Sequence, residues 1–392
     1  MHPELFRLPV FGITVKTYGL FLVVGFLSAV WLAMRRAERV KASPDRVLDV
    51  SFLALIFGVA GARLFYVVHY WKSQFADSPN PILAVVDIRQ GGLEFLGGLL
   101  GAMLAIVIYL LMAKESVRLY LDILAPGAMW GLAFGRLGCY FNGCCFGGAC
   151  AVAAAGGPQY PWGVQFPYGS PAHQKAWEDR QVTVPAELIN TRTMPASLLW
   201  PASLSVPIEV REGPKRQVER LEKALADATA SDPDAAQVAK IERELQAAKK
   251  ALQAVRQEHH LDDLEWAQQY PSRESPGRKT SVSELERLAA QCVSPPVHPT
   301  QLYSSMHAFL LSGLLSAVFY QRKRHGVVIG LLLLLYPIGR VSLEVIRADN
   351  PHDSLGLTVS QLVALGMFVI GAVYLVILYR FMPERSAKKI AD

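Results

Sequence analysis

The sequence predicts an all-α integral membrane protein with seven transmembrane helices, the N-terminus outside the cell and the C-terminus inside. Hydrophobic residues make up 52% of the chain and charged residues 18%, and the apolar residues form long blocks between short basic clusters. This composition is typical of membrane proteins. A helix needs about 20 apolar residues to cross a bilayer. Seven segments meet this length, at about 17–35, 48–71, 92–113, 119–138, 301–320, 325–347 and 357–379.

The fourth segment is the least apolar of the seven. It contains Asp122, Pro126 and several glycines. A helix that packs among other helices tolerates such residues, because its neighbours satisfy the freed backbone groups. We count it as a span. Without it, every later loop would lie on the side of the membrane opposite to the one that the basic residues of that loop indicate.

Lysine and arginine positions indicate the orientation, because short cytoplasmic loops carry the excess positive charge. With the N-terminus outside, the inner segments hold Arg35, Arg36, Arg39, Lys41, Arg46, Lys114, Arg118, Arg322, Lys323, Arg324, Arg380, Arg385, Lys388 and Lys389. The short outer segments hold only Arg7, Lys16, Lys72 and Arg89. The net charge of +6 therefore reflects orientation and contact with anionic lipid, and no nucleic-acid partner is expected.

The chain divides into three regions. Residues 1–147 contain four helices, residues 148–297 form a polar insert with no segment apolar enough to cross the membrane, and residues 298–392 contain three helices and a cytoplasmic tail. The insert is expected outside the cell membrane. Within it, apolar residues at three- and four-residue steps predict an antiparallel helical hairpin at about 214–260. Its charged faces suit either a solvated surface or a partner-binding element.

Polar side chains in or beside apolar spans are functional candidates, because a charge inside a bilayer is costly. Four such clusters occur, and all their residues except Arg340 and Glu344 are expected near outer helix ends. They are Tyr18-Gly19 before the first span, the glycine-rich stretch 91–98 before the third, residues 135–147 at the end of the fourth, and residues 298–303 with Arg340, Glu344 and Arg347.

Two of these clusters resemble the motifs of one enzyme family. Gly-Arg-x-Gly-x-x-x-Asn-Gly, which starts at Gly135, is similar to the signature of the prolipoprotein diacylglyceryl transferases, and His-Pro-Thr-Gln-Leu-Tyr at 298–303 is similar to their second landmark. The resemblance covers about 1–147 and 298–380, and the insert carries no family signal. It implies an enzyme of the bacterial cytoplasmic (inner) membrane that needs no cofactor. Such an enzyme transfers diacylglyceryl from phosphatidylglycerol to the lipobox cysteine of prolipoprotein signal peptides and releases glycerol phosphate.

Arginine is the residue best suited to bind the lipid phosphate, because its planar fork of donors matches phosphate geometry. Arg136 is the first candidate, and the resemblance implies that Arg340 stabilises the departing glycerol phosphate. The structural alternatives are an interfacial side chain for Arg136 and an ion pair with Glu344 for Arg340. The other lipid-binding candidates are Asn142, Gln301, Tyr303, Tyr336, Glu344 and Arg347, and the other catalytic candidates are Glu94, His298 and Tyr18.

The base that activates the acceptor cysteine is less apparent. The cysteine must react as thiolate, and the family's proposed base is a histidine in the third-helix motif, where this chain has Leu96. Glu94 cannot simply replace it, since residues two apart on a helix point to nearly opposite faces. Three explanations stay open: Glu94 or His298 acts from another direction, the arginines alone lower the thiol pKa, or the chain lacks the activity.

The signature departs from the family at Cys139 and Cys144, where many members have Asn and Glu. With Cys145, Cys150 and Cys292, the chain has five cysteines on the predicted outer side. An oxidising compartment favours disulfides, so disulfide bridging is expected. No metal site is predicted, because paired Cys-x-x-Cys spacing and a nearby histidine are absent.

Three other functions remain as alternatives. A membrane thiol–disulfide oxidoreductase would use the cluster of Cys139, Cys144 and Cys145. A catalytically silent scaffold would present the helical hairpin to a partner. A transporter would use the intramembrane Arg and Glu, but the matching interrupted helices typical of transporters are not evident.

Overall fold

The structure is a computed structural model that describes residues 4–8, 13–76, 80–87, 91–150, 162–230, 235–269, 280–347 and 356–381. Within these limits the chain forms two compact units. We call Gly148–His298 the inserted unit, and His2–Gly147 with Pro299–Asp392 the membrane unit. Arg89 and three basic residues of the predicted tail, Arg385, Lys388 and Lys389, lie outside the described residues.

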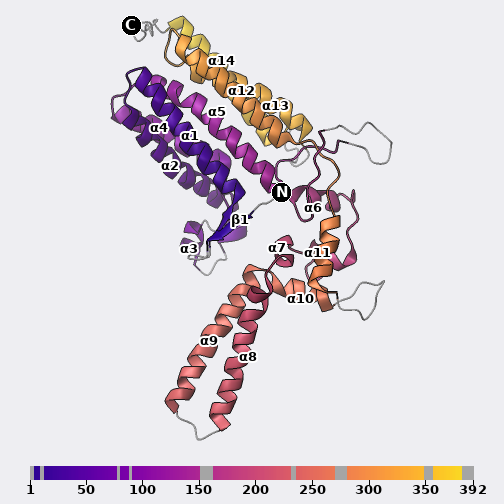
Figure 1. Cartoon of the computed structure of the whole chain (residues 1–392). Coiled ribbons are helices and arrows are strands. Elements are labelled where there is room, and N and C mark those ends of the chain that lie inside the picture. Colours follow the sequence, from indigo (N-terminus) through magenta and orange to yellow (C-terminus); the bar gives the residue numbers. More distant parts are fainter. Residues whose placement is uncertain are drawn as a thin grey trace. The chain divides into compact units, whose positions relative to one another are not determined.

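The membrane unit is a bundle of long helices (Figure 1). They are α1 (Thr17–Arg39), α2 (Pro44–Tyr70), α4 (Phe95–Met112), α5 (Val117–Asn142), α12 (Thr300–Gln321), α13 (Val327–Ile346) and α14 (Val359–Phe381). A π-helical turn (Trp71–Phe75) follows α2 and leads to the short α3 (Pro81–Val86). The antiparallel strands β1 (Glu4–Leu8) and β2 (Ile13–Lys16) precede α1. This strand pair was not predicted, because strands this short give little periodicity.

Among the described residues, six helices are long and apolar enough to cross a membrane: α1, α2 with its π turn, α4, α12, α13 and α14. Many of their large apolar side chains point away from the protein, among them Leu27 on α1, Phe52 on α2 and Ile370 on α14. Outward-facing apolar side chains on several long helices require a lipid surrounding. The protein is therefore an all-α, multi-pass integral membrane protein.

The least apolar of the predicted spans, α5, packs between α1 and α12. Its Asp122 is fully buried and has a structural function. The carboxylate accepts hydrogen bonds from the backbone N–H groups of Gly326 (2.7 Å) and Ile329 (3.0 Å) and forms an ion pair with Arg322 (3.0 Å). It thus satisfies free N–H groups at the start of α13. The charged residue that makes α5 less apolar than the other spans is therefore there to anchor a neighbouring helix.

Glycines bring α2 and α4 into backbone contact. A Cβ atom on Gly61 would lie 2.5 Å from the carbonyl oxygen of Gly97, and one on Gly101 would lie 2.5 Å from that of Phe57. Gly97 and Gly101 are four residues apart on α4, the small-xxx-small spacing that lets membrane helices approach closely. Part of the glycine-rich stretch at 91–98 is therefore explained by helix packing.

The inserted unit has its own apolar core. Its helices are α6 (Pro171–Glu178), α7 (Pro201–Leu204), α8 (Ile208–Ala230), α9 (Ala235–Glu258), α10 (Leu261–Gln269) and α11 (Val282–Gln291), with the short strands β3 (Ile189–Asn190) and β4 (Ser197–Leu198). The core includes Tyr168, Leu188, Leu264 and Leu285, all buried. These side chains give the unit a folded centre separate from the membrane helices.

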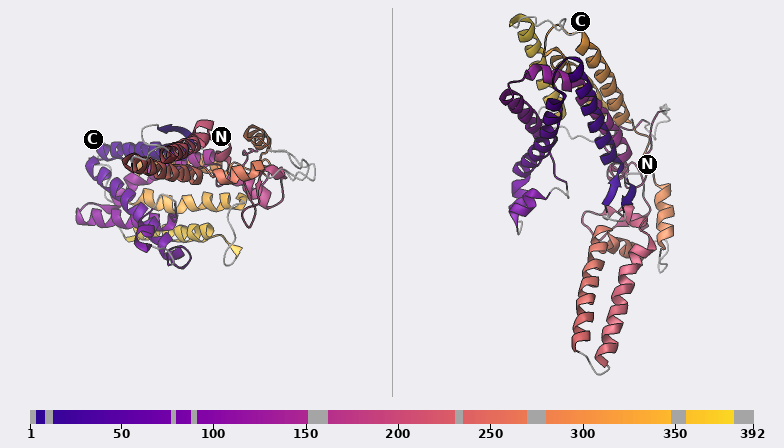
Figure 2. Two further views of the ribbon diagram at one scale, coloured as in Figure 1. Left: turned by 90° about the horizontal axis from the view of Figure 1, so that it is seen from below. Right: turned by 60° about the vertical axis from the view of Figure 1, so that its left-hand side comes forward.

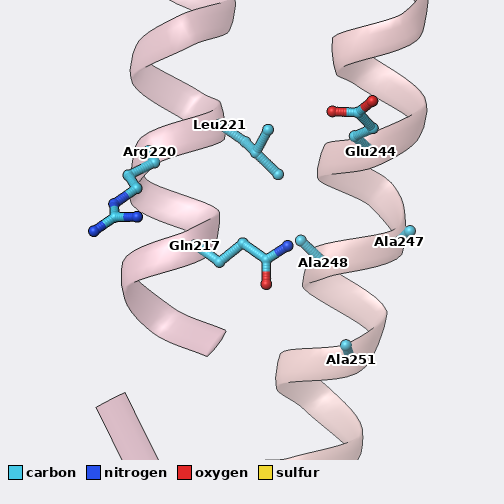
Figure 3. Close-up of a pocket in the computed structure, with 7 residues that line it drawn as sticks. All are labelled: Gln217, Arg220, Leu221, Glu244, Ala247, Ala248 and Ala251. Carbon is cyan, nitrogen blue, oxygen red and sulfur yellow. The ribbon is translucent and has the colours of Figure 1, made fainter. Parts of the chain in front are cut away.

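Helices α8 and α9 lie side by side as an antiparallel hairpin (Figures 1 and 2). A small apolar seam joins them through Val218, Leu245 and Ala248, and Lys249 pairs with Glu222 at 2.8 Å. A groove of about 520 Å³ lies between the two helices. Figure 3 shows the residues that line it, which are Gln217, Arg220, Leu221, Glu244, Ala247, Ala248 and Ala251. None of the residues predicted for lipid binding or catalysis lies in this groove.

Candidate functional site

The predicted signature forms the last turns of α5 and the turn that follows. Gly143 has a φ of 73° and ends the helix, and the N–H of Cys144 donates to the carbonyl of Cys139 at 3.2 Å. Glycine is favoured at such a left-handed helix end because it lacks a Cβ atom. Cys145 also has a positive φ, of 60°. A non-glycine residue in this region costs of order 1–3 kcal/mol, so other contacts must hold the turn.

The first turn of α12 supplies those contacts. Thr300 donates its hydroxyl to the carbonyl of Cys145 (2.6 Å), and Gln301 donates its side-chain amide to the carbonyl of Cys144 (2.7 Å). Gln301 is fully buried. Its position suits holding the turn better than the lipid binding predicted from sequence. Thr300 and Gln301 thus fix the backbone of the two signature cysteines, Cys145 and Cys144.

A network of charges joins α13 to the start of α14. Arg340 donates to Glu344 and, at 2.8 Å, to Ser360, while Thr358 donates to the other carboxylate oxygen of Glu344 at 2.7 Å. Arg347 lies 3.9 Å from the same carboxylate. Since the Glu344 side chain is only 1% exposed, it positions the two arginines and cannot itself reach a lipid.

The ion pair between Arg340 and Glu344, which the sequence analysis gave as the structural alternative for Arg340, is therefore present. The Arg340 side chain keeps 14% of its surface exposed, so the ion pair leaves part of the guanidinium accessible. Backbone pairing between Gly147 and Arg347 connects α13 to the end of the signature turn. The α13 arginines and the signature consequently belong to one assembly within the membrane unit.

Arg136 differs from these arginines. It lies half-buried on α5, two turns before the helix end. It forms no hydrogen bond or ion pair with any residue that the structure describes, whereas Arg340 and Arg347 both pair with Glu344. A half-buried guanidinium without a protein partner is a ready binding group for an external anion.

The remaining predicted residues are more dispersed. Tyr18 lies on the first turn of α1 against Gly138, whose Cβ position would be 3.0 Å from the tyrosine ring. Asn142 is exposed at the end of α5 and Tyr303 is half-buried on α12. Tyr336 packs against the helix core, a position that suits packing better than lipid binding. His298 belongs to the inserted unit, where its N–H donates to the carbonyl of Gly148 at 3.0 Å.

Glu94 has a partner that the sequence analysis did not identify. Its carboxylate lies 2.7 Å from Nδ1 of His69, which is in the last turn of α2. The backbone of Glu94 is fixed as well, because its N–H donates to the carbonyl of Ala62 at 3.0 Å. His69 carries the signal that identified the other candidates, a polar side chain at the end of an apolar span.

Arg63, a turn and a half earlier on α2, is used structurally. Its guanidinium donates to the carbonyl groups of Ala84, Val85, Asp87, Gly91 and Gly92 at 2.7–3.0 Å. It thereby ties both the end of α3 and residues 91–92, just before Glu94, to α2.

All five cysteines are described and all are free. The disulfides expected from sequence are therefore not formed. The sulfur atoms of Cys139, Cys144 and Cys145 nevertheless lie within 4.8 Å of one another. The turn after α5 brings together three thiols that are separated by up to six positions in the chain.

A sequence model of prolipoprotein diacylglyceryl transferases matches residues 3–217 and 243–377. The chain belongs to this family. Because the match includes most of the inserted unit, the expectation that residues 148–297 carry no family signal is wrong. Only residues 218–242, the tip of the hairpin and its flanks, lie between the two matched ranges. The rest of the insert therefore lies within the ranges that the family model matches.

Curated members of the prolipoprotein diacylglyceryl transferase family share part of this sequence. A protein of Rhodopirellula baltica named phosphatidylglycerol–prolipoprotein diacylglyceryl transferase is 37% identical over 163 residues, which cover 41% of this chain and 32% of the relative. Proteins of the same name from Photobacterium profundum and Clostridium botulinum are 35% and 34% identical, over 41% and 38% of this chain and 56% of each relative. The chain thus spans between a third and just over half of these relatives' length.

Proposed function

We propose that this family member transfers the diacylglyceryl group of phosphatidylglycerol to the cysteine thiol of a prolipoprotein signal peptide. The observation that carries the proposal is Arg136, a half-buried guanidinium with no partner among the described residues, at the end of a membrane helix. Phosphatidylglycerol presents a phosphate at the headgroup depth where such a side chain binds anions. The names of the relatives state the same donor and acceptor.

The proposed reaction is a displacement at carbon. The acceptor thiolate attacks the glycerol carbon that carries the phosphate ester, an S–C bond forms, and the C–O bond to phosphate breaks. Glycerol phosphate leaves with the electron pair. Arg136 holds the phosphate, and Arg340, oriented by Glu344 and Ser360, stabilises the developing negative charge. Because Arg340 is already oriented, its guanidinium needs little reorganisation in the transition state.

His69 and Glu94 are our candidates for the base. When the proton of the neutral imidazole is on Nδ1 and donated to Glu94, Nε2 is left as an acceptor for the thiol proton. The pair is supported by its 2.7 Å separation and by the 65% exposure of the His69 side chain, which leaves it reachable. Glu94 would orient the imidazole and stabilise its charged form, which explains how a chain with Leu96 at the family's histidine position retains a base.

The membrane arrangement that we infer has seven spans in the inner membrane, with the N-terminus outside and the C-terminus in the cytoplasm. The inference adds α5 to the six apolar helices, since it is 26 residues long and packs between α1 and α12. The distribution of basic residues supports the orientation. In this arrangement Arg136, Glu94 and His69 face the outer leaflet, where the signal peptide emerges.

The first test is transfer of radiolabelled lipid from phosphatidylglycerol to a lipobox peptide by the purified protein. We expect Arg136→Ala to lose about 100-fold or more of this activity, the usual effect of removing one preorganised donor, and Arg136→Lys to lose less. Arg35→Ala is the matched control, because Arg35 is an exposed arginine near the C-terminal end of α1, on the predicted cytoplasmic side. Activity of Arg136→Ala equal to that of the control would contradict the role of Arg136, and an inactive folded wild type would contradict the transferase.

The second test concerns the base. We expect His69→Gln and Glu94→Gln each to slow transfer at neutral pH by about 100-fold, which is the lower end of the range that general-base catalysis usually contributes. The loss should shrink above the thiol pKa of about 8.5, where the acceptor ionises unaided. The control is His260→Gln, which removes an exposed histidine of the inserted unit. A loss that is equal at every pH would show that His69 only maintains structure.

A further inference from the structure

Three thiols converge beside the proposed phosphate site. The sulfur atoms of Cys139, Cys144 and Cys145 all lie within 4.8 Å of one another. A metal–thiolate bond of about 2.3 Å places two sulfurs on one ion about 4 Å apart, so the three sulfurs need only a small adjustment to share an ion. The other two cysteines, Cys150 and Cys292, belong to the inserted unit.

The backbone holds the three thiols in place before any ligand binds. Cys139 is on the last turn of α5, and the left-handed Gly143 turns the chain back so that Cys144 lies over it. The positive φ of Cys145 is kept by Thr300, whose hydroxyl bonds the Cys145 carbonyl. A fixed arrangement lowers the entropic cost of binding. The fixed backbone also distinguishes this trio from cysteines that are close to one another only in the sequence.

Two cationic side chains act on this trio, because the charges of Arg347 and Arg136 both reach the Cys145 thiol. Thiolate is the form that binds metals. The two guanidinium groups also offset negative charge that several thiolates would otherwise accumulate in a half-buried place.

We propose that Cys139, Cys144 and Cys145 form a binding site for one soft metal ion, monovalent copper. The group contains three sulfur ligands and no imidazole or carboxylate, and all-sulfur donor sets select soft ions such as Cu(I). Zn(II) in structural sites takes four ligands, one more than this group supplies. Three thiolates and one Cu(I) leave a charge of about −2. Arg136 supplies one positive charge, and the group of Arg340, Arg347 and Glu344 supplies one more.

Copper binding and lipid transfer both involve Arg136, but each is measured without the ligand of the other. Copper binding forms three Cu–S bonds, and the thiol protons pass to solvent, so the affinity must rise with pH. No electron transfer is involved if the ion is supplied as Cu(I). A failure of copper binding therefore leaves the lipid-transfer proposal intact, and an inactive transferase leaves the copper site intact.

The test is an anaerobic titration of the full-length protein in detergent with Cu(I), in competition with a chromophoric Cu(I) chelator. We expect one Cu(I) per chain, a thiolate-to-copper absorption band, and at least a tenfold weaker affinity in each of Cys139→Ser, Cys144→Ser and Cys145→Ser. Cys150→Ser and Cys292→Ser are the matched controls and should bind as the wild type does. Binding that survives the loss of Cys139, Cys144 and Cys145 together would overturn the site.

A second measurement needs no substitution. Copper should protect three of the five cysteines of the wild type from alkylation, and peptide mass spectrometry should identify them as Cys139, Cys144 and Cys145. If protein isolated from membranes with alkylating reagent present contains a disulfide within this trio, or if copper protects other cysteines, the proposal is wrong.

Discussion

Gly339 and Arg340 illustrate how two adjacent residues of one motif act differently. Arg340 is bonded to Glu344 and Ser360 and offers charge to the site. Gly339 makes room, because a Cβ atom there would lie 2.3 Å from the imidazole of His307 on α12. His307 is another polar residue inside a span that the sequence analysis did not single out. The close packing of α12 on α13 next to Arg340 depends on this absent side chain.

We therefore expect Gly339→Ala to destabilise the protein by about 1–3 kcal/mol, the usual cost of overpacking, and to lower transfer activity by displacing Arg340. Thermal unfolding in detergent measures the first effect. Gly313→Ala is the control, since nothing lies within 4 Å of its Cβ position. The double variant Gly339→Ala/His307→Ala should regain stability, because it removes the clashing ring. If the double variant is no more stable than Gly339→Ala, the clash is not the cause.

At the scale of the helix, one glycine-rich stretch both packs α4 and positions a pair that we propose to be catalytic. Glu94, just before the first residue of α4, meets His69, while Gly97 and Gly101 bring α4 against α2. Apolar periodicity predicts neither property, because a helix buried in lipid is apolar on all faces. The glycine spacing was visible in the sequence, but its partner helix was not.

Gly97→Val tests the α2–α4 contact. The Cβ position of Gly97 lies 2.5 Å from the carbonyl oxygen of Gly61 and from the Phe65 side chain, so the helices must separate. We expect a loss of about 2 kcal/mol or more in stability, together with lower transfer, because His69 and Glu94 would move apart. Gly366→Ala on α14 has open space at its Cβ position and should leave both properties unchanged. Equal stability of the two variants would contradict close helix packing here.

At the scale of the whole molecule, the inserted unit has a core of its own, and the hairpin is an extension from it. Each hairpin helix reaches this core only near its base, through Val210 of α8 and Val255 of α9. Farther out the two helices are held by the smaller seam around Val218 and Leu245. We therefore expect that residues 218–242, which the family model leaves unmatched, can be removed with little effect on the rest.

Replacing residues 218–242 with a short Gly-Ser loop should leave lipid transfer within about twofold of wild type, since surface insertions have a modest thermodynamic effect. Transfer and thermal unfolding of the shortened protein are the measurements. Leu264→Ala, in the core of the inserted unit, should by contrast cost about 2–5 kcal/mol. Loss of transfer on shortening, with the fold intact, would contradict this expectation and show that the hairpin contributes to the reaction.

The sequence alone determined the membrane class, the helix positions, the family and the two arginines most suited to phosphate. Apolar length, basic loops and short local motifs carry these properties, because each depends on residues that are neighbours in the chain. The tertiary structure alone decided which residues meet. The contacts that it decided all depend on how helices and turns pack, and no local pattern specifies that packing. They are the contact of His69 with Glu94, the position of Glu344 between two arginines, the hydrogen bonds of Asp122 to the start of α13, and the convergence of three thiols.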